Sequence, residues 1–311
     1  MTAVLVLAVV TAGCIQASAA LAAARWPRRS PAAAIILWQA IGLGWGLAAV
    51  GTLLGLGTAS QRGGIAGGTA AEISGLLRGQ GLPAGGLIAA ARLACLAAGL
   101  VLLALLVWVL LAASAAVLRA RQRQHLLLSL LAHGDPKVPG ALVVDHPAAA
   151  AYCLPGLRSA IVISAGTLDL LDGDELAAVL AHERAHLRER HDLVLLPFSA
   201  LLQAFRWSGN ACAAQQAVAL LIEMHADDRA RRQRPARELA TALLRVGAAG
   251  GCQAPSGALA LAADDLEGEV AARVTRLLRP VPGLSALALA AVGLAAAAAV
   301  VIPVAVLAVP F

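Results

Sequence analysis

The stretch Val179–Asp192, V-L-A-H-E-R-A-H-L-R-E-R-H-D, decides the fold that we expect for the domain around it. On a helix, His182 and His186 are four residues apart and lie on one face, with Glu183 one residue further round. Two imidazoles at that spacing can bind one Zn²⁺, while the carboxylate beside them reaches the water that attacks a scissile carbonyl. The stretch therefore predicts a helix that carries a catalytic zinc site, with His182 and His186 as ligands and Glu183 as general base.

The spacing H-E-x-x-H is specific in a chain with few histidines. The 311 residues include seven His, so a chain of this composition contains one such motif by accident on the order of a few times in a thousand. The alternative is an exposed charged helix with incidental histidines. On the other faces of the helix we do expect such a solvated surface, formed by Arg184, Arg188, Glu189 and Arg190.

The residues before the motif indicate how its helix begins. An aspartate among residues 172–174 is a natural N-cap, and acidic residues in the next positions suit the positive end of a helix. Apolar residues then recur at helical spacing, at Leu176, Val179 and Leu180. Further upstream, Ala141–Asp145 and Ala160–Ser164 are rich in β-branched residues and bounded by Pro and Gly, which is typical of short strands. We therefore expect an α+β domain.

A catalytic zinc site needs a third protein ligand, and Glu223 is our candidate. It follows an apolar helical run in A-L-L-I-E-M-H-A-D-D-R-A, so it can project from a buried helix toward the two histidines. Asp227 lies one turn further on the same face, where it can accept the other N–H of a ligating histidine. Taken alone, a glutamate at this place is more often a cap or an ion-pair partner. Because it accompanies H-E-x-x-H, we interpret Glu223 as a ligand and Asp227 as the residue that orients one.

Outside this domain the chain has the composition of an integral membrane protein. Hydrophobic residues make up 60% of it and charged residues 14%, and the mean hydropathy is +0.79, far from the values of soluble domains. The first apolar segment lacks the basic start of a signal peptide and runs into arginines, so we interpret it as a span. Four segments are apolar over the roughly 20 residues that a bilayer requires: Ala3–Ala24, Ala32–Gly57, Leu93–Val117 and Pro282–Val309.

The arginines beside the spans predict the orientation of the chain. They follow the first span, follow the third and precede the fourth, and the positive-inside rule makes that side cytoplasmic; they are Arg25, Arg28, Arg29, Arg119, Arg121, Arg123, Arg273, Arg276 and Arg279. We therefore expect both termini outside a cell membrane that the chain crosses four times. Residues 1–117 hold three spans and a short Gly-rich outer loop, residues 118–280 a cytoplasmic zinc domain, and residues 281–311 the fourth span.

Composition also disfavours several classes of site and function. The net charge of +6 serves orientation and does not indicate direct binding of nucleic acid. The spans carry no ionisable residue in their cores, unlike those of a carrier or channel. The cysteines are odd in number and show no CxxC spacing, so neither a disulfide framework nor a cysteine zinc site is expected; they are Cys14, Cys95, Cys153, Cys212 and Cys252.

Together these residues resemble a known family. His182-Glu183-x-x-His186, followed 37 residues later by Glu223 in E-x-x-A-D, is similar to the gluzincin metallopeptidases of membranes. The approach to the motif, from Tyr152 onward, also looks like theirs. Three spans before the zinc domain and one after it resemble the layout of the BlaR/MecR-type receptors, whereas the HtpX type normally has a different span arrangement. Those receptors carry an extracellular penicillin-binding sensor after the fourth span, whereas this sequence ends at Phe311, so we do not expect antibiotic sensing to carry over.

The resemblance implies a membrane-embedded zinc endopeptidase with one Zn²⁺ per chain, bound by His182, His186 and Glu223, and with Glu183 as general base. Its substrate would be a membrane-proximal or cytoplasmic regulatory protein, such as a transcriptional repressor, or the chain itself. Two alternatives stay open: an HtpX-like quality-control protease, and a signalling receptor with a non-catalytic zinc site. The oligomeric state is also open, although the small-residue-rich stretch Ala286–Ala299 permits close helix packing.

Further residues have two interpretations each. His191 and Asp192 either orient a ligand or end the helix favourably. His225 and Arg229 are candidates to stabilise an oxyanion, although a surface role is the commoner one. Tyr152 lies near a predicted edge strand that could hold substrate, but core packing is favoured. The apolar runs Leu193–Phe205 and Ala211–Ile222 are too short to span a bilayer, so we expect buried helices that return Glu223 to the zinc, with Pro197 at a bend and residues 206–210 as the turn.

Overall fold

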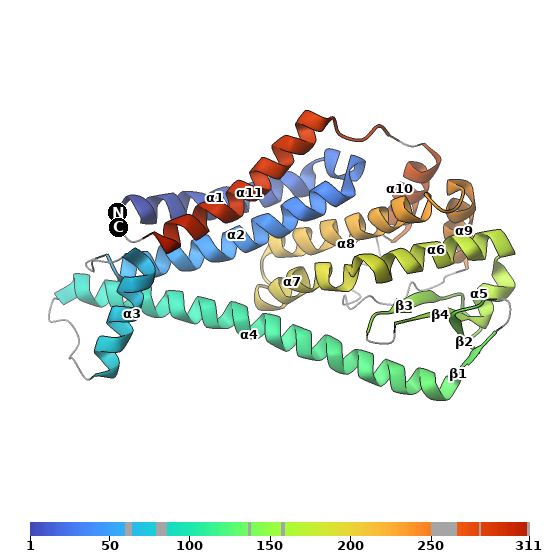
Figure 1. Cartoon of the computed structure of the whole chain (residues 1–311), viewed down its shortest axis with the longest axis horizontal. Coiled ribbons are helices and arrows are strands. Elements are labelled where there is room, and N and C mark those ends of the chain that lie inside the picture. The colour runs from blue at the N-terminus through green and yellow to red at the C-terminus, as the bar shows by residue number, and fades with distance from the viewer. Residues whose placement is uncertain are drawn as a thin grey trace.

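We describe a computed structural model of the chain, which covers residues 1–59, 64–78, 86–135, 138–156, 159–249, 266–279 and 281–309. Four long helices run alongside one another, and a small sheet with shorter helices lies at the end opposite Met1 (Figure 1). The chain is thus mostly helical, as the composition predicted.

Four helices of the described chain are long and apolar enough to cross a bilayer: α1 (Thr2–Ala23), α2 (Pro31–Gly57), α4 (Gly86–Leu131) and α11 (Ala286–Ala308). Each contains all or most of one of the four predicted spans. A short 3-10 helix, η1 (Trp26–Arg29), joins the first two. The predicted outer loop contains a helix of its own, α3 (Gly64–Leu77), while Arg62 of that loop and Cys252 lie outside the described residues.

Helix α4 continues well beyond the predicted third span. Its 46 residues correspond to a length of about 70 Å at 1.5 Å per residue, against a hydrocarbon core of about 30 Å. The predicted span ends at Val117, but the helix reaches Leu131 before the first strand begins. The proposed boundary between residues 117 and 118 therefore falls within one continuous helix.

The apolar helices pack closely through small residues of α2. A Cβ on Gly44 would lie 2.2 Å from the carbonyl oxygen of Ala299 in α11, and one on Gly57 would lie within 2.9 Å of the backbone of Leu96 in α4. Such approaches exclude any side chain at these two positions. Within this chain, α2 is therefore the partner of the Ala-rich stretch Ala286–Ala299.

The sheet has four short strands in the order β1-β2-β4-β3. Strands β2 and β4 are parallel, and the two outer pairs are antiparallel. Two strands were predicted, as β2 and β4, and the edge strand expected near Tyr152 is present as β3; β1 was not expected. The bounds are β1 Ala132–Gly134, β2 Ala141–Val144, β3 Ala151–Leu154 and β4 Ala160–Ser164.

In the described part of the domain, six helices accompany the sheet: α5 (Ala165–Leu170), α6 (Gly173–Glu189), α7 (His191–Ala204), α8 (Gly209–Ala230), α9 (Ala236–Ala248) and α10 (Leu266–Leu278). The predicted N-cap of the motif helix is Asp172, whose side chain accepts from the backbone N–H of Glu175 while Glu175 accepts from its backbone N–H in return. Helix α6 is followed by Arg190 as its C-cap, and this residue, with a φ of 51° in the left-handed region, turns the chain directly into α7.

The hairpin of α7 and α8 joins the domain to the spans. Phe198 of α7 packs edge-on against Trp38 of α2, with ring centroids 6.2 Å apart. One buried cluster combines Cys14, Ala34 and Ile41 of the spans with Leu195, Val218 and Ile222 of the hairpin. The two predicted buried helices are thus confirmed, with Pro197 inside α7. Figure 1 shows the α7–α8 turn beside α2 and α4.

Candidate metal centre

The motif helix α6 and the hairpin helix α8 bring the three candidate ligands together. Nε2 of His182 lies 3.0 Å from Nε2 of His186. The two oxygens of Glu223 lie 3.3 Å from His182 Nε2 and 3.4 Å from His186 Nε2. Within the described residues these three side chains form the group that could hold a metal ion, with ligand atoms all within 4.8 Å of one another.

The spacing of these atoms fits zinc. Bonds of about 2.0–2.1 Å in a tetrahedron separate neighbouring ligand atoms by about 3.3–3.4 Å, and the observed separations are 3.0, 3.3 and 3.4 Å. Two imidazoles and one carboxylate are also a donor set that catalytic zinc uses, with one position left open for the reaction. The residues present therefore fit a zinc ion in both spacing and chemistry.

Asp227, the residue expected to orient a ligand, lies behind the first histidine. Its Oδ1 is 3.0 Å from Nδ1 of His182, so Nδ1 carries the proton and Nε2 is left to face the ligand cluster. Burial alone would raise the pKa of Asp227, but the adjacent Arg273 guanidinium lowers it to about 2. Asp227 is therefore a permanent acceptor at neutral pH.

The carboxylates of Asp227 and Glu223 make the metal centre favourable for a positive charge. Burial alone would lower the pKa of His182, but its contacts with Asp227 and Glu223 raise it to about 10. The pKa of Glu223 lies well below its usual value despite burial, because His186 and Arg273 are next to it. A bound cation such as Zn²⁺ would satisfy the same demand.

Glu183 is half-buried beside the ligands, where a general base is required. Desolvation raises its pKa to about 7, and the negative charge of Glu223 adds to this effect while His182 opposes it. Its carboxylate faces Cys153 of β3, whose thiol pKa is raised by burial and then by Glu183 and Asp192. The base thus lies between the motif helix and the edge strand.

A buried arginine completes the centre. Arg273 of α10 donates from Nε and Nη2 to the two oxygens of Asp227, at 2.9 and 2.8 Å, and its Nη1 lies 3.0 Å from Glu223. In the sequence this residue counts only as one of the arginines that predict orientation, because nothing in its surroundings Val270–Leu278 marks it as part of a site. Its role depends on a contact 46 residues away in the chain.

His191, which had two interpretations, lies behind the second ligand. Its Nδ1 is 3.0 Å from Nδ1 of His186, and its ring packs edge-on against that of His225, with centroids 5.5 Å apart. Asp192, the other residue of that pair, forms an ion pair with Arg121 of α4. His191 therefore contacts a ligand, whereas Asp192 ties α7 to the third long helix.

The two candidates for oxyanion stabilisation do not lie at the ligand cluster. Arg229 forms an ion pair with Glu189 at 2.7 Å, and His225 lies 4.0 Å from the same carboxylate. Both side chains thus face Glu189, the last residue of α6. Tyr152 packs in an apolar cluster with Leu128, Leu154 and Val162, which agrees with the core role favoured for it.

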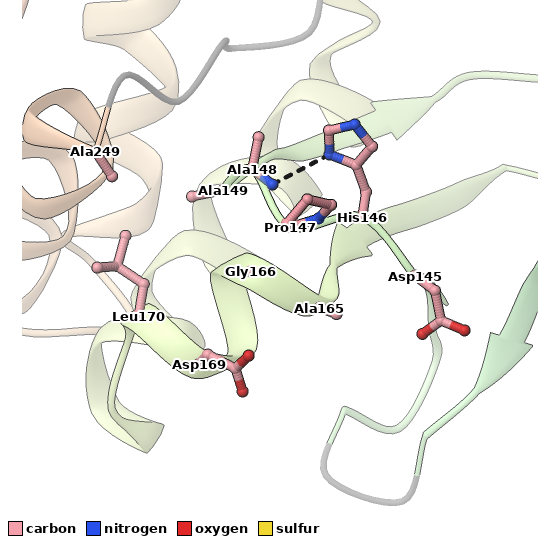
Figure 2. A pocket seen from close by; sticks show the side chains of 10 residues that line it. All are labelled: Asp145, His146, Pro147, Ala148, Ala149, Ala165, Gly166, Asp169, Leu170 and Ala249. Atoms are coloured by element: carbon pink, nitrogen blue, oxygen red, sulfur yellow. Dashed lines mark hydrogen bonds between the residues drawn. The ribbon is translucent and has the colours of Figure 1, made fainter.

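A separate pocket lies elsewhere in the domain. Figure 2 shows it between the connection after β2 and helix α5, with a volume of about 590 Å³. His146 uses its Nδ1 to accept from the backbone N–H of Ala148, and the carboxylates of Asp145 and Asp169 lie apart from the His146 ring in Figure 2. The pocket contains none of the candidate ligands, and among the described residues the group that could hold a metal ion lies outside it.

Comparison with known proteins agrees with this centre. Residues 97–245, just under half of the chain, match peptidase family M48, whose members are zinc metallopeptidases. The match includes the two histidines, both glutamates and Asp227, and it ends before α10 and Arg273. Neither the curated proteins nor the solved structures contain a significant match. The matched segment implies metallopeptidase activity.

Proposed function

With the match to peptidase family M48 as premise, we propose that this chain is a membrane-embedded zinc endopeptidase. The observation that carries the proposal is the cluster of His182, His186 and Glu223 at tetrahedral spacing, with a carboxylate of raised pKa, Glu183, next to it. A structural zinc site has no use for such a base, because its four positions are filled by protein. The signalling receptor with a non-catalytic zinc site is therefore the weaker alternative.

The residues of the centre divide the chemistry between them. When bound, zinc supplies a Lewis acid that polarises the scissile carbonyl and acidifies water. Glu183 accepts the proton of the attacking water and passes it to the leaving amine. Asp227 holds His182 in the tautomer that presents Nε2, and His191 does the same for His186. The raised pKa of Glu183, about 7, suits a group that must both accept and release a proton near neutral pH.

The substrate in this proposal is a membrane-proximal or cytoplasmic regulatory protein, a repressor or the chain itself. Two features support a site close to the bilayer: the α7–α8 hairpin shares a core with the spans, and α4 leads from the third span into the sheet without a break. The edge strand β3, which lies against α6, offers a backbone on which an extended peptide can add as a further strand. In this proposal the domain is cytoplasmic and the termini are outside, which the arginines beside the spans support.

The layout of three spans before the domain and one after it favours a BlaR/MecR-type switch. HtpX-like quality control is the second candidate, because unfolded membrane proteins would also meet a site at this depth. The two roles differ in breadth: a switch cleaves one partner at one bond, whereas a quality-control protease cleaves many unfolded segments.

The test measures metal content and cleavage on the purified full-length chain. Wild type is compared with Glu183→Ala, Glu223→Ala and, as a control, Glu189→Ala, which removes a carboxylate on the same helix that pairs with Arg229. We expect about one zinc per chain, lost in Glu223→Ala and kept in Glu183→Ala, with cleavage of casein or of the chain itself lost in both. If Glu183→Ala cleaves as wild type does, the proposal is wrong and the zinc is structural.

A further inference from the structure

Arg273 is an arginine held almost entirely out of solvent. Only 2% of its surface is exposed, although a guanidinium stays charged at any physiological pH. A buried charge of this kind persists only where it is paired and hydrogen-bonded. Its partners are the carboxylates of Asp227 and Glu223, so the charge lies at the metal centre.

The contact with Asp227 is bidentate. Nε donates to Oδ2 at 2.9 Å and Nη2 donates to Oδ1 at 2.8 Å, and a pair of parallel bonds fixes the plane of a carboxylate as well as its position. The last torsion of an aspartate is otherwise broad. Once the plane is fixed, Oδ1 faces Nδ1 of His182 at 3.0 Å.

The same guanidinium reaches the candidate ligand. Its third nitrogen, Nη1, lies 3.0 Å from Oε2 of Glu223. Glu223 and Asp227 are one turn apart on α8, so a single planar fork spans both carboxylates. A lysine would supply the positive charge but not the planar set of N–H donors, here called the fork, because its ammonium is a point charge on a flexible stem.

A second arginine of α10 offers a natural comparison. Arg276, one turn after Arg273, donates to both oxygens of Asp228 at 2.8 and 2.6 Å and from Nε to the carbonyl of Arg28 at 2.7 Å. It therefore holds α10 against α8 and against the corner between the first two spans. Asp228 is not in the ligand cluster, so Arg276 binds the same two helices together without touching the centre.

We propose that Arg273 is a positioning residue of the metal centre. It fixes the planes of the Asp227 and Glu223 carboxylates and, through Asp227, the tautomer and direction of His182. It acts through these carboxylates and not on substrate. The inference rests on the proposed function, since positioning has meaning only if the cluster binds a metal, and it adds a residue beyond the segment that matches the peptidase family.

The test measures Zn²⁺ affinity of the full-length chain in detergent by competition with a chelating dye. The variants are Arg273→Met, Arg273→Lys and the matched control Arg276→Met. We expect both Arg273 variants to bind Zn²⁺ about 10–100-fold more weakly than wild type, which is the usual effect of losing an outer partner of a ligand. Arg276→Met keeps wild-type affinity. The d–d absorption of Co²⁺-substituted protein, which reports ligand geometry, changes in the Arg273 variants alone.

Each other outcome has a defined meaning. Unchanged or tighter Zn²⁺ binding by Arg273→Met overturns the proposal, because the guanidinium would then act only as a repelling charge. Wild-type affinity in Arg273→Lys overturns it too, since charge without the fork would suffice. An equal loss in Arg276→Met assigns the effect to docking of α10. The melting temperature of the metal-free variants separates folding from positioning, and the lysine variant decides if Arg273→Met does not fold. If wild type binds no Zn²⁺, the proposed function fails instead.

Discussion

Replacing His191 by leucine is expected to lower zinc affinity while it leaves the metal-free stability nearly unchanged. His191 is 4% exposed, and its Nδ1 lies 3.0 Å from Nδ1 of His186. When Nε2 of His186 is the ligand atom, its Nδ1 carries the proton and donates to His191. The other nitrogen of His191, Nε2, is buried without a hydrogen-bond partner in the described part of the chain.

The contacts of His191 set the expected changes in zinc affinity and in stability. Loss of the acceptor behind a ligand lowers metal affinity about 10–100-fold, which corresponds to about 1.4–2.7 kcal/mol. In the metal-free protein, the substitution removes the buried Nε2 that has no partner, at a gain of about 1–3 kcal/mol, but it also leaves Nδ1 of His186 without its acceptor, at a cost of similar size. Leucine has a similar volume, so these two effects nearly cancel and the metal-free stability of His191→Leu is expected to stay close to that of wild type.

The assay has two readouts on each variant: Zn²⁺ affinity by dye competition, and the melting temperature after removal of metal. The control is His225→Leu, because the His225 ring contacts His191 while His191 alone reaches His186. An unchanged Zn²⁺ affinity in His191→Leu would refute the reasoning, and so would an equal loss in His225→Leu. A large drop in the metal-free melting temperature would show instead that His191 is a structural residue.

Three more predictions concern the same domain. Glu183→Gln is expected to lower cleavage by a factor of about 10²–10⁴, the contribution of a general base, while Zn²⁺ content stays at the wild-type level. Asp172→Ala removes the N-cap of α6 and is expected to cost about 1 kcal/mol in thermal unfolding; Asp174→Ala, an exposed residue of the same turn, is the control. Gly166→Ala would place a Cβ 2.0 Å from a backbone carbonyl and is expected to prevent expression of folded protein, whereas Gly134→Ala, with open space around it, is tolerated.

The parts of the site that the sequence predicted are those whose geometry is local. The four-residue spacing of His182 and His186 places both rings on one face of any helix, and the capping pair of Asp172 and Glu175 sets where that helix begins. Glu223 was found because it ends an apolar run and needs only to be on a neighbouring helix. These inferences require no knowledge of how distant segments pack.

The parts that the sequence did not predict depend on contacts between distant segments, or leave too weak a signal in the local sequence. Arg273 has the same local surroundings whether it faces lipid headgroups or two carboxylates, and only the packing of α10 on α8 decides between them. The continuation of α4 beyond the third span to Leu131 was not predicted, because hydropathy reports where a helix leaves the bilayer and not where it ends. Residues 118–131 contain no Gly or Pro, so the helix continues through residues, mostly Arg, Gln and Leu, that have good helix propensity. The short strand β1 gives too few residues for an alternating pattern.

The candidate ligands and the spans depend on a common set of packing contacts. Glu223 follows directly after Val218, Leu221 and Ile222, which are buried in the same cluster as Trp38 of α2, and Gln39 of α2 donates to the carbonyl of Val194 in α7 at 2.7 Å. The position of the third ligand therefore depends in part on the packing of α8 on the spans, while α6 packs on the sheet, on α9 and on α8 itself. A shift of the spans relative to the sheet would move Glu223 relative to the two histidines. The ligand atoms of His182, His186 and Glu223 lie only 3.0–3.4 Å apart. A displacement of about 1 Å is therefore enough to disrupt metal binding. In the protease that we propose, the arrangement of the spans is thus itself a condition for activity.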